Sequence, residues 1–157
     1  MNIQASPASS STVTAPPAPR TLADTGLSSV MMRDILLKTM FRTNLDRVSE
    51  IAVAVSLPVN LTQDLVDQAR SQKLLEATGT MHATSGNEMG YQLTDAGKAR
   101  ALDALSQSEY YGAMPVPLAT YGEQVKRQSV RDIKLSRHQL MSGMGHLILP
   151  PDLIDNL

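Results

Sequence analysis

The stretch YQLTDAGKAR at residues 91–100 decides the fold, because it joins the end of a strand to the start of a helix. Residues 91–93 alternate apolar and polar side chains, which is typical of a strand. Thr94 and Asp95 then favour a helix start, since a Thr hydroxyl can accept a hydrogen bond from the first-turn backbone. We therefore predict a strand that ends at Leu93 and a helix that ends before Gln107. The apolar side of that helix comprises Ala96, Ala99, Leu102 and Leu105.

A β-hairpin is predicted immediately before this stretch. Residues 74–84 and 88–93 read as two extended runs, and Ser85-Gly86-Asn87 separates them. Gly and Asn tolerate the backbone conformations that tight turns require. The helix after the hairpin therefore follows a small antiparallel ribbon.

A long helix is predicted to begin at Ser28 or Ser29. Ser28 suits the N-cap position, and Leu27 with Met32 would form a hydrophobic staple. Helical spacing places Asp34, Lys38 and Arg42 on a narrow polar stripe that we expect to be solvated. The apolar arc, the first large piece of core, comprises Met32, Ile35, Leu36, Leu37, Met40 and Phe41.

Two shorter helices follow and form a helix-turn-helix pattern. The first covers residues 45–55. Leu57-Pro58 is its stop signal, because the position before a proline disfavours helix. Asn60 and Gln63 suggest a capping box for the next helix. Its inner stripe comprises Leu61, Leu65, Val66 and Ala69, and its outer face comprises Gln63, Asp64, Asp67, Arg70 and Ser71.

The order helix, helix, helix, hairpin, helix over residues 27–107 is that of a winged helix, so we expect a mainly α fold with a small β-hairpin. Residues 1–26 are rich in Ala, Ser, Thr and Pro and are expected to be disordered. Residues 108–118 should be an extended connector, because Pro115 and Pro117 interrupt helix. Residues 119–157 read as a helical lead-in, with a capping box at Ser136 and Gln139.

Residues 27–157 resemble the amino-terminal region of a group of bacterial AAA-family ATPases. The motif Y-x-L-T-x-A-G at residues 91–97 supports the resemblance, as does the ending at residues 147–157, which follows L-x-L-P-x-x-L-x-x-L as far as Leu153 and has its last leucine one residue later, at Leu157. That family hydrolyses ATP through a following core with a Walker A loop. This sequence has no G-x-x-x-x-G-K-[ST], so we expect no ATP site on the chain. The resemblance implies a truncated gene, an excised region or a stand-alone paralogue.

Composition argues against most enzyme and cofactor classes. The chain has no Cys, which excludes disulfides, thiolate nucleophiles and cysteine-based metal sites. His82, His138 and His146 match no metal-binding spacing, and no G-x-S-x-G elbow occurs. We therefore expect no catalytic residue, cofactor or metal. There is neither a signal peptide nor an apolar run long enough to span a bilayer, so the default expectation is a cytosolic protein with no membrane partner.

Charge separates two binding hypotheses. Residues 27–107 carry eight basic and nine acidic side chains, so few DNA phosphates could be neutralised. A winged helix that reads DNA would use its third helix, and Gln63, Arg70 and Lys73 would then be the contacts. A small DNA-binding transcriptional regulator is therefore the alternative hypothesis. The candidate contact face for either kind of partner comprises Gln63, Asp64, Asp67, Arg70, Ser71 and Lys73.

The preferred hypothesis is a non-catalytic module that binds a protein partner or an AAA motor. Residues 147–157 concentrate large apolar side chains, which suggests a docking surface. Its candidate residues are Leu147, Ile148, Leu149, Leu153, Ile154 and Leu157. Coupling to a motor could also make the chain part of an oligomer. An enzyme is the least favoured of the three readings.

Overall fold

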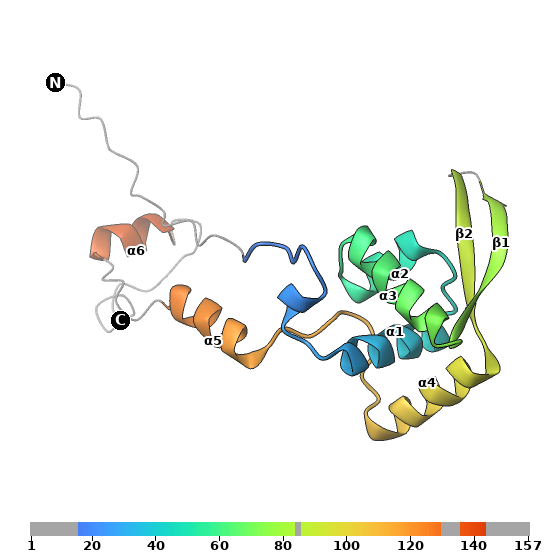
Figure 1. The fold of residues 1–157 in the computed structure, drawn as a ribbon. Helices are drawn as coiled ribbons and strands as arrows, with labels where there is room; N and C mark the ends of the chain where they lie inside the picture. Colours follow the sequence, from blue (N-terminus) through green and yellow to red (C-terminus); the bar gives the residue numbers. More distant parts are fainter. Residues whose placement is uncertain (1–15, 84–85, 130–135, 144–157) are drawn as a thin grey trace. The chain divides into compact units, whose positions relative to one another are not determined.

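The computed structural model describes residues 16–83, 86–129 and 136–143 (Figure 1). Their elements are a 3-10 helix η1 (Ala23–Thr25), helices α1 (Ser29–Thr43), α2 (Val48–Val55) and α3 (Val59–Ser71), strands β1 (Leu75–Ala83) and β2 (Gly86–Leu93), and helices α4 (Asp95–Gln107), α5 (Leu118–Arg127) and α6 (Arg137–Gly143). The described residues up to Glu123 form one compact unit. The described residues from Gln124 onward belong to a second unit.

The compact unit is a winged helix, as the sequence predicts. Helices α2 and α3 form the helix-turn-helix, and β1 pairs antiparallel with β2, with Leu75 opposite Leu93 and Ala83 opposite Gly86. Figure 1 shows the hairpin reaching well beyond the helices, whereas α4 runs beside α1. The register shifts between Ala77 and Gly79, where Gly79 has a φ of 97° that suits glycine.

Helix α1 is the centre of the core. Its apolar side packs with α2, α3, the base of the hairpin and α4. The buried cluster includes Met32, Leu36, Leu37, Met40, Val48, Ile51, Val55, Leu57, Leu65, Val66, Ala69, Leu75, Tyr91 and Ala101. The hydrophobic gain from burying these side chains is what holds the helices against the small sheet.

The start of α1 confirms its predicted cap, but its polar stripe is solvated only at Arg42. The Ser28 hydroxyl accepts a hydrogen bond from the Met31 backbone N–H at 3.2 Å. Lys38 is buried, and Asp34 contacts Arg100 of α4. The expectation of a solvated stripe was wrong for Asp34 and Lys38, because α4 covers this part of α1. Phe41, expected in the core, is 37% exposed, since it lines an open hollow between α1, the hairpin base and α4.

The two helices of the helix-turn-helix begin at different residues from those predicted. Residues 46 and 47 are extended beside β2, where the Asp46 carbonyl accepts from the Tyr91 N–H at 2.8 Å and Arg47 bridges Gly90. Helix α2 therefore starts at Val48. Helix α3 starts one residue before Asn60, and its N-cap is Pro58 without a side-chain cap. The predicted capping box is absent because Asn60 already lies within the helix.

Helix α4 has the predicted cap but a different buried side. The Thr94 hydroxyl accepts from the Gly97 N–H at 3.0 Å. Leu105 is buried as predicted, whereas Leu102 is 54% exposed and Ala96 and Ala99 are also exposed. The other buried residues are Gly97, Ala101 and Ala104, so α4 packs through small side chains.

The compact unit extends beyond the predicted limits of 27 and 107. Leu22 is partly buried against the core, and η1 precedes α1, so residues 16–26 differ from the expected disordered tail. After α4 the connector has no helix, as predicted, but it is fastened to the domain. The Thr39 hydroxyl accepts from the Gly112 N–H at 2.9 Å, and the Val55 carbonyl accepts from the Met114 N–H at 2.8 Å.

The lead-in contains two short helices among its described residues. Helix α5 lies at the start of the segment predicted to be a helical lead-in. The capping box before α6 is confirmed, because Ser136 N–H donates to Gln139 Oε1 at 2.9 Å and Gln139 N–H donates to Ser136 Oγ at 3.3 Å. The docking segment predicted at residues 147–157 lies outside the described residues. None of the helices within the described ranges is long and apolar enough to cross a membrane.

Candidate binding face of α3 and the hairpin

The outer side of α3 is polar and open to solvent. Leu61, Leu65 and Val66 are buried on the inner side, as the apolar spacing predicted. Gln63 is half-buried, and the other predicted contact residues, Asp64, Asp67, Arg70, Ser71 and Lys73, are exposed. Burial of the inner side therefore fixes the orientation of α3 and leaves its outer side accessible to another molecule.

Arg70 is held in place by two neighbours. Its Nη1 atom lies 3.1 Å from Oδ1 of Asp67, one turn earlier on α3. Its guanidinium carbon lies 5.5 Å from the ring centroid of Tyr91 on β2, within the range of a cation–π contact. Arg70 is the basic residue of the α3 outer face, and these two contacts partly satisfy its charge within the domain.

Tyr91 links the hairpin to α3. Its side chain is buried, and its hydroxyl accepts a hydrogen bond from Gln63 Nε2 at 3.3 Å. Gln63 Nε2 also donates to Asp67 Oδ2 at 3.1 Å. We call the four residues Gln63, Asp67, Arg70 and Tyr91 the α3 network. Sequence analysis identified the three α3 residues but missed Tyr91, because the strand pattern does not show which helix the ring will contact.

The remaining predicted contact residues lie around the network. Asp64 and Ser71 border a hollow of about 510 Å³ that Arg20, Thr21 and Leu22 also line. The segment before α1 therefore lies along one flank of α3. Lys73 follows α3 in a left-handed conformation with a φ of 58°. The structure thus brings Gln63, Asp67 and Arg70 together, and places the other three on the periphery.

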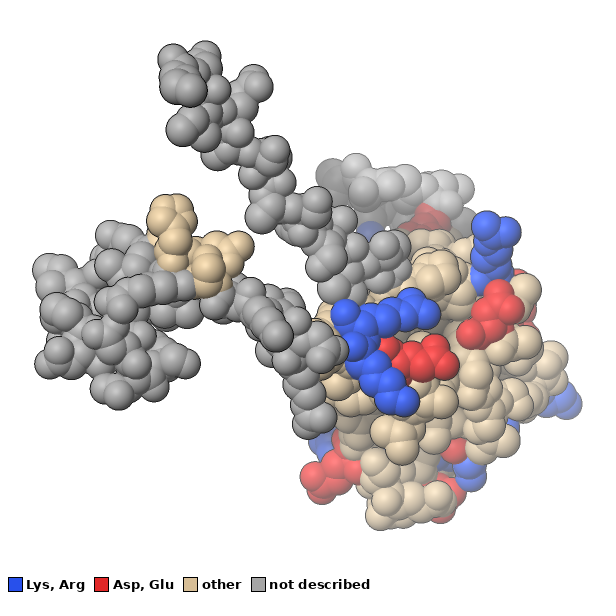
Figure 2. All heavy atoms as spheres, turned by 90° about the vertical axis from the view of Figure 1, so that its left-hand side faces the viewer, with Lys and Arg blue, Asp and Glu red and all other residues tan. Residues whose placement is uncertain are grey.

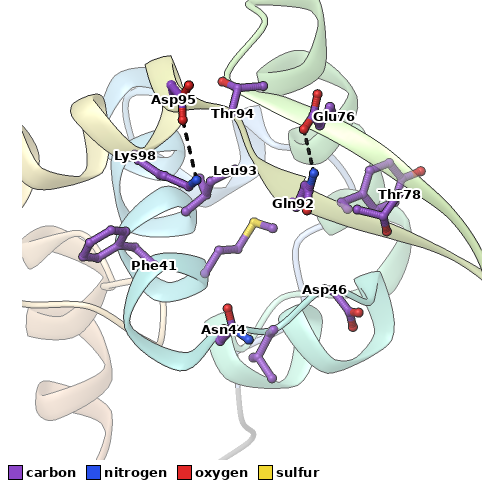
Figure 3. Close-up of a pocket in the computed structure, with 13 residues that line it drawn as sticks. Phe41, Asn44, Asp46, Glu76, Thr78, Gln92, Leu93, Thr94, Asp95 and Lys98 are labelled. Atoms are coloured by element: carbon purple, nitrogen blue, oxygen red, sulfur yellow. Dashed lines mark hydrogen bonds and ion pairs between the residues drawn. The ribbon is translucent and has the colours of Figure 1, made fainter.

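A larger hollow of about 620 Å³ lies on the other side of the hairpin base (Figure 3). Its wall contains three carboxylates, Asp46, Glu76 and Asp95, and one ammonium, Lys98. Glu76 accepts from Gln92 at 2.6 Å, and Lys98 pairs with Asp95 at 3.6 Å. Because carboxylates outnumber the ammonium, the potential around this hollow disfavours phosphate groups. Sequence analysis missed this hollow, which is assembled from α1, the loop before α2, the hairpin and α4.

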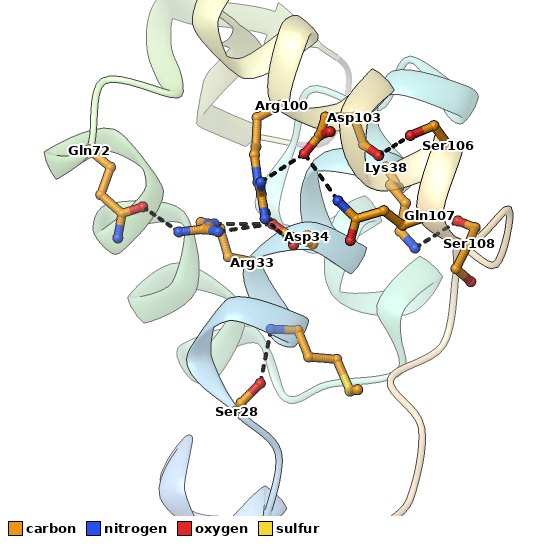
Figure 4. Close-up of polar contacts among 11 residues, drawn as sticks. Ser28, Arg33, Asp34, Lys38, Gln72, Arg100, Asp103, Ser106, Gln107 and Ser108 are labelled. Atoms are coloured by element: carbon orange, nitrogen blue, oxygen red, sulfur yellow. Dashed lines mark hydrogen bonds and ion pairs between the residues drawn. The ribbon is translucent and has the colours of Figure 1, made fainter.

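Two further arginines of the domain, Arg33 and Arg100, are also paired, whereas Arg42, Arg47 and Lys73 are in none of the ion pairs among the described residues. Asp34 accepts from both Arg33 and Arg100, with 2.6 Å between its Oδ2 and Nη2 of Arg100 (Figure 4). This contact raises the pKa of Arg100 above its ordinary value. On the face seen in Figure 2, the described Lys and Arg side chains lie among Asp and Glu side chains without forming a patch of a single sign. The described residues of this face therefore form no continuous positive surface for a polyanion.

The described part of the chain contains no group of three or more His, Cys, Asp or Glu side chains placed to hold a metal ion. His138 is exposed on α6, and His146 lies outside the described residues. The polar side chains of α3 donate and accept hydrogen bonds to one another. Their arrangement suits recognition of another molecule.

Comparison with known proteins gives a fold likeness alone. Neither a protein-family model nor a curated protein matches the chain. Among solved structures it is similar to Bordetella bronchiseptica BpsR, studied for the regulation of its DNA binding by 6-hydroxynicotinic acid, at 11% identity and a TM-score of 0.40 over 76% of this chain and 77% of that chain. It is also similar to an apo variant of Lactococcus lactis ZitR at 13% identity, with a TM-score of 0.43 over 74% of this chain and 82% of that chain. At these identities and TM-scores the likeness concerns the fold and not the function.

Proposed function

We propose that the chain is a non-catalytic winged-helix recognition module that binds a protein partner through α3 and the hairpin. The α3 network supports this proposal best. Arg70, which would have to meet a DNA phosphate or base, is paired with Asp67 and stacked on Tyr91. With Asp64 and Asp67 against Arg70, the outer face counts two negative charges and one positive.

Such a face suits a protein surface that offers basic side chains and hydrogen-bond donors. Interfaces favour aromatic residues and arginine, and ordered polar groups lose little conformational entropy on binding. The resemblance of residues 27–157 to the front end of AAA ATPases makes a motor protein, or a substrate delivered to one, the proposed partner. Catalysis would then belong to that motor.

Duplex DNA is the second candidate. Helix α3 is the second helix of a helix-turn-helix, and its exposed polar side chains could reach base edges in a major groove. DNA is also the ligand named for BpsR. Recognition would then depend on base contacts, because few phosphate contacts are available.

A paired experiment separates the two candidates. A photo-crosslinking amino acid replaces Ser71 on the α3 flank, and a matched control replaces Leu102 on the exposed side of α4. We expect the Ser71 position to crosslink a specific protein in cells, the Leu102 position not to do so, and Arg70→Ala to reduce the product. The purified chain is titrated in parallel with labelled duplex DNA at low salt. Saturable DNA binding that weakens with salt and is lost in Arg70→Ala would overturn the protein proposal and establish the second candidate.

A further inference from the structure

Lys38 is a buried cation outside the α3 network. Only 5% of this residue is exposed, and it lies between the middle of α1 and the carboxyl end of α4. Its Nζ donates one hydrogen bond, at 3.2 Å, to the carbonyl oxygen of Ser108 (Figure 4). No ion pair among the described residues includes Lys38. Asp34, one turn earlier on α1, is occupied by Arg33 and Arg100.

The surroundings compensate only part of this charge. Ser108 is the C-cap of α4, and the carboxyl end of a helix carries roughly half a negative charge. An ammonium has three N–H donors, of which this hydrogen bond uses one. Buried charges are normally paired with an opposite charge, because burial removes the stabilisation that water provides. Lys38 therefore retains capacity for an anionic partner.

A groove of about 330 Å³ lies beside this ammonium. Its polar wall comprises Lys38, Asp34, Ser28, Gln107 and Ser108, and the rest is apolar. Val30, Met31 and Tyr110 are each about half exposed, so the groove is open to solvent. The apolar lining comprises Val30, Met31, Ile35, Ala104, Tyr110 and Pro115. A mostly apolar cavity with a few convergent polar groups, at the small end of about 300–1,000 Å³, is typical of small-molecule sites.

We propose that this groove binds a small organic acid. Its carboxylate would accept hydrogen bonds from the free donors of Lys38, and its apolar body would lie against Met31, Tyr110 and Pro115. Asp34 also lies in the groove wall, but its carboxylate is shared by Arg33 and Arg100, so the charge of Lys38 is the one that an anion would compensate. No residue of α3 lines this groove, so the test of acid binding does not depend on the proposed partner binding.

The test titrates the full-length chain with phenylacetate and with phenylacetamide, its neutral counterpart, and follows α1 and α4 amides by NMR. We expect saturable shifts around Lys38 and Ser108 with phenylacetate, and binding at least roughly tenfold weaker with the amide, because a hydrogen bond to a charged group is stronger than a neutral one. Lys38→Met keeps the length and apolar stem of the side chain and should weaken phenylacetate to the level of the amide. Arg42→Met, one turn further along α1 at an exposed position, is the matched control and should bind as the unaltered chain does.

A second variant keeps the test decisive if Lys38→Met fails to fold. Met31 is half exposed in the first turn of α1, where an acidic side chain is compatible with the helix dipole. Met31→Asp should therefore fold and abolish phenylacetate binding, because it adds to the groove wall a carboxylate that, unlike Asp34, has no arginine partner. The proposal is overturned if phenylacetate does not bind saturably, if the amide binds equally well, or if either groove variant binds as tightly as Arg42→Met.

Discussion

Helices α3 and α4 each contain 13 residues, yet they contribute to the domain in different ways. Helix α3 buries large side chains such as Leu61, Leu65 and Val66. Helix α4 buries Gly97, Ala101 and Ala104 together with Leu105. Large apolar residues anchor α3 from one side and leave its polar face free, whereas small residues let α4 approach its neighbours closely.

Their arginines differ in the same way. Arg70 of α3 pairs with Asp67 of the same helix, and both side chains are about half exposed. Arg100 of α4 reaches Asp34 of α1, whose side chain is only 15% exposed. The same pair of chemical groups therefore joins two helices in one place and orders the polar face of α3 in the other. This difference predicts that changes on α4 will affect mainly stability and changes on α3 mainly binding.

Gly97→Ala should have the largest effect. A Cβ at this position would lie 2.0 Å from the carbonyl oxygen of Leu74, so α4 would have to move away from the hairpin base. We expect a loss of about 3 kcal/mol or more in the free energy of unfolding, measured by urea denaturation. Gly122→Ala on α5, where nothing lies within 4 Å, is the matched control and should not destabilise the domain. Equal stability of the two variants would disprove close packing at α4.

Asp34→Ala should have the next largest effect. It leaves Arg33 and Arg100 without their shared carboxylate in a partly buried site, which should cost about 2–3 kcal/mol of unfolding free energy. Asp103→Ala removes the exposed partner of the same Arg100 and should cost less than about 1 kcal/mol. Chemical denaturation of both variants measures the difference. Comparable losses would show that the α1–α4 pair is no more important than a surface pair.

Arg70→Ala should change stability less than Asp34→Ala does. An exposed ion pair and a single cation–π contact together should contribute about 1 kcal/mol or less. The crosslink from the Ser71 position should nevertheless fall, because Asp67 and Gln63 lose a neighbour that orders them. Urea denaturation and crosslink yield measured on the same preparation test the contrast. A large loss of stability with an unchanged crosslink would reverse the roles assigned to the two helices.

Asp24 should show the smallest effect, confined to η1 before α1. The side-chain hydroxyl and backbone N–H of Thr21 and the backbone N–H of Arg20 lower the pKa of the Asp24 carboxyl below its ordinary 3.8. Because the pKa of Asp24 is lower in the folded state, the stabilisation from its ionised carboxylate is fully present above the ordinary pKa. It is lost as the pH falls through the lowered pKa. NMR titration of the Arg20 and Thr21 amides should therefore give a midpoint below 3.8. A midpoint at or above that value would contradict the hydrogen bonds seen here.

Local patterns were sufficient for most of the fold. Ser28 and Thr94 cap the predicted helices because an N-cap depends only on residues within one turn. The inner side of α3 likewise follows from the apolar spacing, whereas β2 begins at Gly86, within the Ser85-Gly86-Asn87 segment that was predicted to be the turn. Three of the four residues of the α3 network were identified for the same reason, since they share one face of one helix.

Tertiary structure determined the contacts between residues that lie far apart in the sequence, which no local pattern predicts. The buried side of α4 follows from the fit of Gly97 against Leu74 and from the pair between Arg100 and Asp34, whose partners lie far apart in the sequence. The same holds for Tyr91, which meets α3 only after the hairpin folds back, and for Lys38, which is buried only because α4 and the connector cover it. The sequence by itself determined the elements and the polar face of α3, because both depend on short-range periodicity. Only packing determined which charges are buried and which remain available for binding.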